Sequence, residues 1–153
     1  MVIAFVASTQ VYAISFSVSR AISAPVDKVW EVISNVENET QYLPVVEPMK
    51  NIDKITIERV VTISLGPQNN TSHQLVSIYP EEKKIETNFT EGLITGTKML
   101  KLEPIYENKS EVSVIWNFDI SSGLNVSRGI AEADLKQATI DAVRSITKAA
   151  ESL

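Results

Sequence analysis

The sequence predicts an α+β fold, in which a curved antiparallel sheet of about six to seven strands wraps around a long C-terminal helix, with two short helices after the first strand. Three observations predict it. A period-two strand pattern begins at Tyr12, a long series of similar strands fills residues 55–120, and a proline-free helical stretch ends the chain. An antiparallel sheet with one apolar face has to cover that face, and the last helix is the largest cover available.

The first strand and the first helix follow from local patterns. From Tyr12, apolar residues alternate with serines, as in a strand that has one buried face. Ser23 is then placed to cap a helix, and Pro25 fits its first turn, where a missing N–H costs nothing. Apolar residues at helical spacing predict that this helix runs from about residue 25 to residue 36.

The next segment, NVENETQYLP, predicts a second short helix. Either Asn38 or Thr40 can cap it, and Pro44 ends it, because the residue before a proline is pushed out of the helical region. Alternation by two then continues to residue 120, interrupted by the polar turns GPQNN, PEEK and ENKS. This pattern predicts consecutive antiparallel hairpins.

Residues from about Val126 to Ser152 predict a single helix about 39 Å long, enough to cross a whole sheet. Its predicted apolar stripe is Ile130, Leu135, Ala138, Ala142, Val143, Ile146, Ala149 and Leu153. The small side chains of Ala131, Ala138 and Ala142 either leave room for a ligand or let the helix approach the sheet closely. A strongly curved sheet does not close tightly on a helix everywhere, so we expect a cavity between them.

Length and composition restrict the function. A chain of 153 residues with 44% hydrophobic content suits a single domain, 1–153, with residues 1–11 as a flexible or strand-extending N-terminus. The net charge of -5 and the scattered basic residues argue against nucleic acid as a partner. The sequence has no cysteine, one histidine, no spaced acidic loop and no nucleotide-binding glycine motif, so we expect no metal and no cofactor.

The N-terminal residues are compatible with either of two cellular locations, the cytoplasm or the outside of the cell. The stretch MVIAFVASTQVYA is apolar but lacks the basic region of a signal peptide, which favours a cytoplasmic protein. Secretion stays an alternative, and six Asn-x-Ser/Thr sequons would matter in that case. No apolar run reaches the roughly 18 residues of a membrane-spanning helix. For the oligomeric state, we expect a monomer or a weak dimer.

The stretch ISAPVDKVWEVISNVENETQYLP, residues 22–44, resembles the opening motif of the START-like (SRPBCC, birch-pollen-allergen-type) helix-grip superfamily. The strand series and the alanine-rich last helix extend the resemblance over residues 12–152. Because of the Tyr-Leu-Pro after the first helix, the chain looks nearest to the polyketide cyclase/dehydrase and coenzyme Q-binding branch. The resemblance implies the helix-grip fold, whereas the members range from lipid and quinone carriers to hormone receptors, cyclases and chaperone activators.

Two polar residues on the predicted strands are candidates for a site. Arg59 shares a strand face with Ile57 and Val61, where an isolated guanidinium is too costly to bury without a carboxylate, a ligand anion or a path to water. It either faces a ligand or is displaced by a bulge or by reaching past the sheet edge. His73 can shuttle protons, or it is a solvated strand-end residue beside the GPQNN turn.

The other candidates are mostly apolar. Four residues that line a cavity or form plain core are expected on the concave face of the sheet: Phe89, Val114, Trp116 and Phe118. Tyr42 and Tyr79 either hold their hydroxyls at the mouth of the cavity or are packing residues whose hydroxyls reach water. Together with Arg59, Ala138 and Ala142, these residues form the predicted ligand-binding site. No catalytic residue is assigned, because no pair of titratable groups stands at a recognisable motif.

The leading hypothesis is a non-enzymatic binder or carrier of a small hydrophobic or amphipathic ligand, such as a lipid, an isoprenoid quinone or an aromatic polyketide-like molecule. Arg59, Tyr42 or Tyr79 would orient its polar head. One alternative is a metal-free cyclase, dehydratase or lyase in which Arg59, His73 or a tyrosine polarises a carbonyl. The other is a protein-interaction module resembling chaperone activators or ribosome-associated relatives, which predicts an exposed apolar patch.

Overall fold

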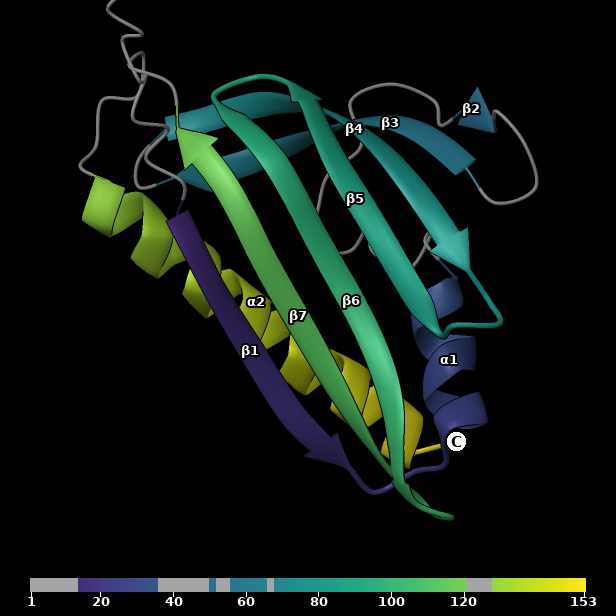
Figure 1. Cartoon of the computed structure of the whole chain (residues 1–153). Helices are drawn as coiled ribbons and strands as arrows, with labels where there is room; N and C mark the ends of the chain where they lie inside the picture. The colour runs from purple at the N-terminus through teal and green to yellow at the C-terminus, as the bar shows by residue number, and fades with distance from the viewer. Residues whose placement is uncertain (1–13, 36–49, 52–55, 66–67, 121–127) are drawn as a thin grey trace, which may run out of the picture.

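The computed structural model of the chain describes residues 14–35, 50–51, 56–65, 68–120 and 128–153 (Figure 1). In chain order the elements are β1 (Ile14–Ile22), α1 (Val26–Ser34), β2 (Lys50–Asn51), β3 (Thr56–Leu65), β4 (Gln68–Tyr79), β5 (Lys84–Glu91), β6 (Ile94–Tyr106), β7 (Lys109–Ile120) and α2 (Arg128–Glu151). The strands form one antiparallel sheet of seven, in the order β1-β7-β6-β5-β4-β3-β2.

The sheet curves strongly, and α2 lies along one side of it (Figure 1). β1, β7 and β6 run side by side, while β3 and β4 cross one end of the sheet at a steep angle to them. α2 contacts β1, β3, β7 and α1. The predicted curved sheet around a long C-terminal helix is confirmed, whereas the predicted second short helix lies outside the described residues. In the described part of the chain, no helix is both long and apolar enough to cross a bilayer.

α1 begins after Pro25, but the expectation that Ser23 caps it is wrong. Pro25 is the N-cap residue, with an extended backbone at φ -66° and ψ 153°, and no side chain caps the helix by a hydrogen bond. The amide of Ser23 instead donates to Glu151 Oε1 of α2 at 3.0 Å. Val29 and Ile33 of α1 are buried. The start of α1 is therefore tied to the end of α2.

The buried stripe of α2 differs from the predicted one. Ala138, Ala149, Ile130 and Leu153 are exposed, and Ala142 is half-buried. The buried residues recur mostly at every fourth position: Ala131, Leu135, Thr139, Val143, Thr147 and Ala150. Threonine is tolerated in this stripe because each hydroxyl donates to the carbonyl four residues earlier, at 2.7 Å from Thr139 and 2.8 Å from Thr147. The prediction that Ala138 meets the sheet is therefore wrong.

Two predicted turns belong partly to strands. β4 begins at Gln68, so the last three residues of the GPQNN segment pair with β3, as Asn70 does with Ile63. His73 consequently lies inside β4 rather than at a strand end. Ser110 of the ENKS segment belongs to β7, where it is fully buried and its hydroxyl donates to the Ala24 carbonyl at 2.7 Å. Both strands are therefore longer than turn chemistry alone predicts.

Candidate functional site

The candidate site is the inner face of the sheet, which is the face turned toward α2. Directly opposed residues of antiparallel strands share a face, and Trp116 identifies the inner one because its indole bonds to Thr139 of α2. One row of inner residues consists of Phe16, Trp116, Lys98, Thr87, Val76 and Ile57. The neighbouring row consists of Ile14, Phe118, Gly96, Phe89, Gln74 and Arg59. The second row changes from aromatic toward polar residues along the sheet, whereas the first row has Lys98 and Thr87 in its middle and ends on Val76 and Ile57.

An aromatic cluster of Phe16, Phe89, Trp116 and Phe118 occupies the β1–β7–β5 part of the inner face. Trp116 stacks with Phe89 at a centroid distance of 5.3 Å and with Phe16 at 6.0 Å. Phe118 meets Trp116 edge to face at 5.7 Å. All except Phe16 are buried, as is Val114 on the same strand face. The structure thus brings together four of the predicted site residues and adds Phe16, which the alternation of β1 already placed on the apolar side.

Gly96 makes room for this cluster. It lies between Phe89 and Phe118 in its row and contributes no side chain there. Its φ of +135° is one that residues with a side chain rarely adopt, and a Cβ at this position would lie 2.6 Å from Phe118 Cα and still closer to the Asn117 carbonyl oxygen. The close approach of β6 to β7 beneath the aromatic rings therefore requires glycine.

Thr139 connects the aromatic cluster to α2. The Trp116 indole N–H donates to Thr139 Oγ1 at 3.0 Å, and the same hydroxyl donates to the Leu135 carbonyl at 2.7 Å. Both ends of the pair are buried, so the indole N–H is satisfied where no bulk water reaches it. This chain of bonds fixes the register of α2 against β7. No sequence pattern predicts this bond, because Thr139 is a polar interruption of the predicted apolar stripe.

The polar end of the inner face is the pair Arg59–Gln74. The two residues are directly opposed on β3 and β4, and each is 2% exposed. Arg59 Nε donates to Gln74 Oε1 at 2.9 Å. Arg59 therefore keeps the strand register, and the alternative that a bulge or the sheet edge turns it away does not apply. Gln74 was missed, although its even spacing from Val76 in the TSHQLVSIY segment is a signal that could have found it.

Lys98 is a second cation on the inner face. It is half-buried on β6, opposite both Thr87 and Trp116, and its Nζ lies 5.6 Å from the centroid of the Trp116 ring. A cation at this distance from an indole face is attracted by the ring quadrupole. Even spacing from the buried Leu100 marks Lys98 in the sequence as an inward residue.

Two other candidates lie apart from this site. His73 and Tyr79 have odd positions on β4, which place them on the outer face, opposite in direction to Gln74. The His73 side chain is 42% exposed, with Nε2 4.0 Å from Glu91 Oε2. Tyr79 lies under Lys84, whose Nζ is 4.7 Å from its ring, and lines a pocket of about 330 Å³ with residues 78 and 80–82. Tyr42 lies outside the described residues.

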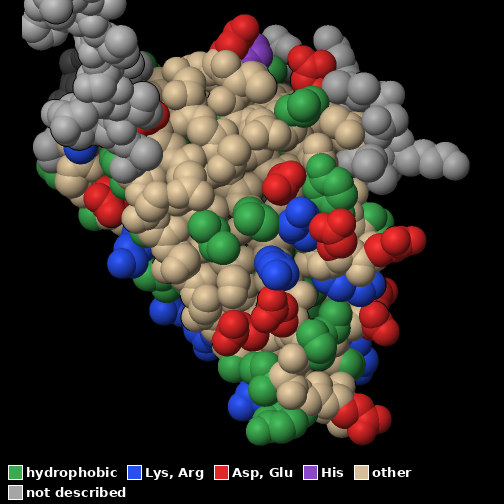
Figure 2. Space-filling model, in the orientation of Figure 1, with side chains coloured by type: hydrophobic (Ala, Val, Ile, Leu, Met, Phe, Trp, Pro, Cys, Tyr) green, Lys and Arg blue, Asp and Glu red, His purple; other side chains and the backbone are tan. Residues whose placement is uncertain are grey.

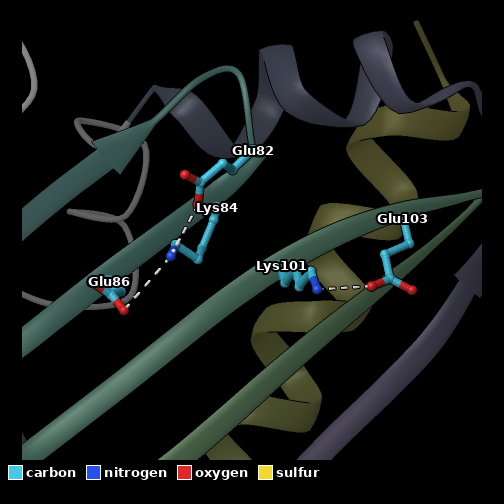
Figure 3. A network of polar contacts seen from close by, with 5 residues as sticks. All are labelled: Glu82, Lys84, Glu86, Lys101 and Glu103. Atoms are coloured by element: carbon cyan, nitrogen blue, oxygen red, sulfur yellow. Dashed lines mark ion pairs between the residues drawn. The ribbon is translucent and has the colours of Figure 1, made fainter.

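The outer face of the sheet around Lys84 carries a set of ion pairs (Figure 3). Lys84 Nζ lies 3.1 Å from Glu82 and 3.9 Å from Glu86, and Lys101 pairs with Glu103 at 3.0 Å. The hydrogen bond to Glu82, helped by the charge of Glu86, raises the pKa of Lys84 above its usual 10.5. Positive and negative side chains are interspersed on the face shown in Figure 2, so it presents no extended field of one sign.

Other types of site find little support in the described ranges. No group of three or more acidic, histidine or cysteine residues is arranged there to hold a metal ion. The large exposed hydrophobic residues of those ranges are Ile105, Tyr106, Ile130 and Leu153. Only Ile105 and Tyr106 are adjacent, at the end of β6, and scattered exposed apolar residues are normal on protein surfaces.

Solved structures with the same arrangement come from several proteins. An aromatase/cyclase, ZhuI, from a Streptomyces species superimposes with a TM-score of 0.80 at 14% identity, covering 92% of this chain and 94% of its own. The di-domain ARO/CYC StfQ from the steffimycin biosynthetic pathway gives a TM-score of 0.70 at 15% identity, covering 92% of this chain and 52% of its own. A START superfamily protein from Mycobacterium smegmatis gives 0.61 at 15% identity, covering 90% and 94%. At these identities the likeness shows the fold.

Sequence comparison adds the family. A search of curated protein sequences finds no match. The sequence profile of the family described as "Polyketide cyclase / dehydrase and lipid transport" matches residues 13–151, which is nearly the whole chain and includes every element from β1 to α2. The match thus covers both the aromatic cluster and the Arg59–Gln74 pair. The protein belongs to the polyketide cyclase/dehydrase and lipid transport family of START-like proteins.

Proposed function

We propose that the protein binds one small hydrophobic or amphipathic molecule at the inner face, between the sheet and α2. One observation carries this proposal: the buried Arg59–Gln74 pair stands in the same cross-strand row as Phe89 and Phe118. Taking the charge of a guanidinium out of water is costly, and at this position its donors can also serve an oxygen-bearing end of a ligand. A ligand with an apolar body and an oxygen-bearing end would meet matching chemistry at both ends of that row.

The row also suggests the size and class of the ligand. Neighbouring strands lie about 4.8 Å apart, so the four steps from β7 to β3 span about 19 Å. This length suits an aromatic polyketide-like molecule, an isoprenoid quinone or a lipid chain. Each 100 Å² of apolar ligand surface that leaves water contributes about 2.5 kcal/mol before the costs of association. The planar fork of Arg59 suits a carboxylate, an enolate or a ring carbonyl at the polar end.

The first experiment looks for the bound molecule. Protein purified from its native host is extracted with organic solvent, and the extract is analysed by mass spectrometry. In parallel, 2-naphthoate is titrated while tryptophan fluorescence is followed. The chain has two tryptophans, of which Trp116 lies in the aromatic cluster and Trp30 on α1. We expect quenching that Trp116→Phe abolishes and Trp30→Phe retains. An empty extract together with an unchanged fluorescence would reject the proposal.

A second candidate function is cyclisation or dehydration of a polyketide-like substrate, in which Arg59 polarises a carbonyl. The burial of Arg59 favours it, since a donor acts more strongly on developing charge where water is excluded. His73 takes no part in this version, because it lies on the outer face. A poly-β-ketone thioester is incubated with the protein and the products are separated by mass. Arg59→Gln is expected to stop any turnover that the matched surface variant Arg20→Gln retains; no turnover by the unmodified protein leaves binding as the function.

A further inference from the structure

Ser72 carries a buried hydroxyl that the fold itself does not use. Its side chain is 3% exposed, and within the described part of the structure its Oγ has no hydrogen-bond partner. Other buried hydroxyls do have one: Ser110 donates to Ala24, Thr139 to Leu135 and Thr147 to Val143. A buried hydroxyl without a partner lowers stability, so its presence calls for a reason outside the packing of the protein.

Ser72 lies at the polar end of the inner face. It precedes Gln74 by two residues on β4 and therefore points to the same side of the sheet. Its direct neighbour on β3 is the fully buried Val61, and Arg59 is its diagonal neighbour, at roughly 7–8 Å between Cα atoms. On the other side the chain passes closely at Gly92, where a Cβ would lie 3.5 Å from Ser72 Cα. Gly92 itself has no side chain that could bond with the Ser72 hydroxyl.

We propose that Ser72 donates a hydrogen bond to an oxygen acceptor at the polar end of the ligand and so sets the specificity for ligands that carry one. The inference rests on the proposed binding function and deepens it. Arg59 lies on β3 beside Gln74 and Ser72 on β4, close enough for one polar head group to contact all three. The preferred ligand class therefore carries a carboxylate, an enolate or a ring carbonyl. An all-hydrocarbon ligand would leave the Ser72 hydroxyl without a partner.

Three naphthalenes of similar shape test this inference: 2-naphthoate has an anionic acceptor, 2-acetylnaphthalene a neutral one, and 2-ethylnaphthalene none. Dissociation constants are measured for the unmodified protein, for Ser72→Ala and for the control Ser77→Ala. Ser77 lies on the same strand but on the outer face. Ser72→Ala is expected to weaken binding of the two acceptor-bearing probes by about two- to tenfold and to leave 2-ethylnaphthalene unchanged. Ser77→Ala is expected to change none of the three.

The outcomes separate the inference from the proposed function. If no probe binds the unmodified protein, the binding function itself fails. If all three bind but Ser72→Ala weakens them equally, or weakens none, the role of Ser72 is overturned while binding stands. The melting temperature of the ligand-free Ser72→Ala protein should stay unchanged or rise, because the substitution removes an unsatisfied group. Ser72→Thr keeps the hydroxyl and should retain the preference for acceptor-bearing probes. Ser72→Val, in which valine has the shape of threonine but no hydroxyl, should lose that preference.

Discussion

Replacing Thr139 by valine isolates the bond that ties α2 to the sheet. The two side chains have the same shape and the same branching at Cβ, so packing and helix propensity change little. The substitution removes the acceptor of the Trp116 indole N–H, which donates to Thr139 Oγ1 at 3.0 Å and is buried. An unsatisfied buried donor costs about 1–3 kcal/mol of unfolding free energy. For a domain of this size, that corresponds to a fall in Tm of about 2–12 °C.

Thr147→Val is the matched control. Thr147 is also buried on α2 and also donates to the carbonyl four residues earlier, but no indole donates to it in the described structure. Its replacement is expected to cost less than about 1 kcal/mol, because the Val143 carbonyl keeps its main-chain helix bond. Urea unfolding followed by circular dichroism gives both free energies, with an equal m-value as the test of unchanged compactness. Equal costs for Thr139→Val and Thr147→Val would refute the assignment of stability to the indole bond.

Three further predictions concern separate parts of the molecule. Arg59→Leu is expected to weaken 2-naphthoate binding by about tenfold or more, since hydrogen bonds to a charged group are strong. The same variant should bind 2-ethylnaphthalene as the unmodified protein does, and the surface variant Arg20→Leu should bind both probes unchanged; equal losses for both probes in Arg59→Leu would contradict the prediction. Gly96→Ala should cost about 2–4 kcal/mol in urea unfolding because of its φ of +135°, whereas Gly129→Ala in the exposed first turn of α2 should stabilise by up to about 1 kcal/mol. The pKa of Lys84 is raised in the folded protein, so its ion pairs make a small contribution to the unfolding free energy, which Lys84→Met removes. This contribution should be complete below pH 10.5, vanish as the pH rises further, and weaken in high salt. If the contribution were already lost near neutral pH, the prediction would be contradicted.

The strand pattern could be predicted from the sequence because each long strand has one buried face. Alternation by two placed Arg59, Phe89, Trp116 and Phe118 on the same side of the sheet, and the pairing of β3 to β7 keeps them there. Their part in ligand binding stays a prediction. The C-terminal helix was predicted from its length and lack of proline, and its role as the cover of the sheet followed from the lack of any other large helix.

Polar residues in the core limited what the sequence could reveal. Thr139 and Gln74 are buried because each finds a partner far away in the sequence, in Trp116 and Arg59. Alternation by two can place Gln74 on the inner face, but no local pattern predicts either partner. For the same reason, the predicted apolar stripe of α2 included Ala138, which is exposed, instead of Thr139, which is buried. The register between β4 and β5 also shifts between His73 and Gln74, and a bulge of this kind leaves no clear mark in residue type.

Two buried hydroxyls, of Thr139 on α2 and of Ser72 on β4, differ in their partners, and under the proposed function two assays should rank them in opposite order. The Thr139 hydroxyl is bonded on both sides by the protein, whereas the Ser72 hydroxyl is bonded by none of the described residues. Thr139→Val should therefore lower the unfolding free energy, while Ser72→Ala should not lower it but should weaken 2-naphthoate binding by about two- to tenfold. Both variants are measured in both assays on the same preparations. A loss of stability in Ser72→Ala as large as that in Thr139→Val would assign Ser72 to the fold and remove it from the ligand site.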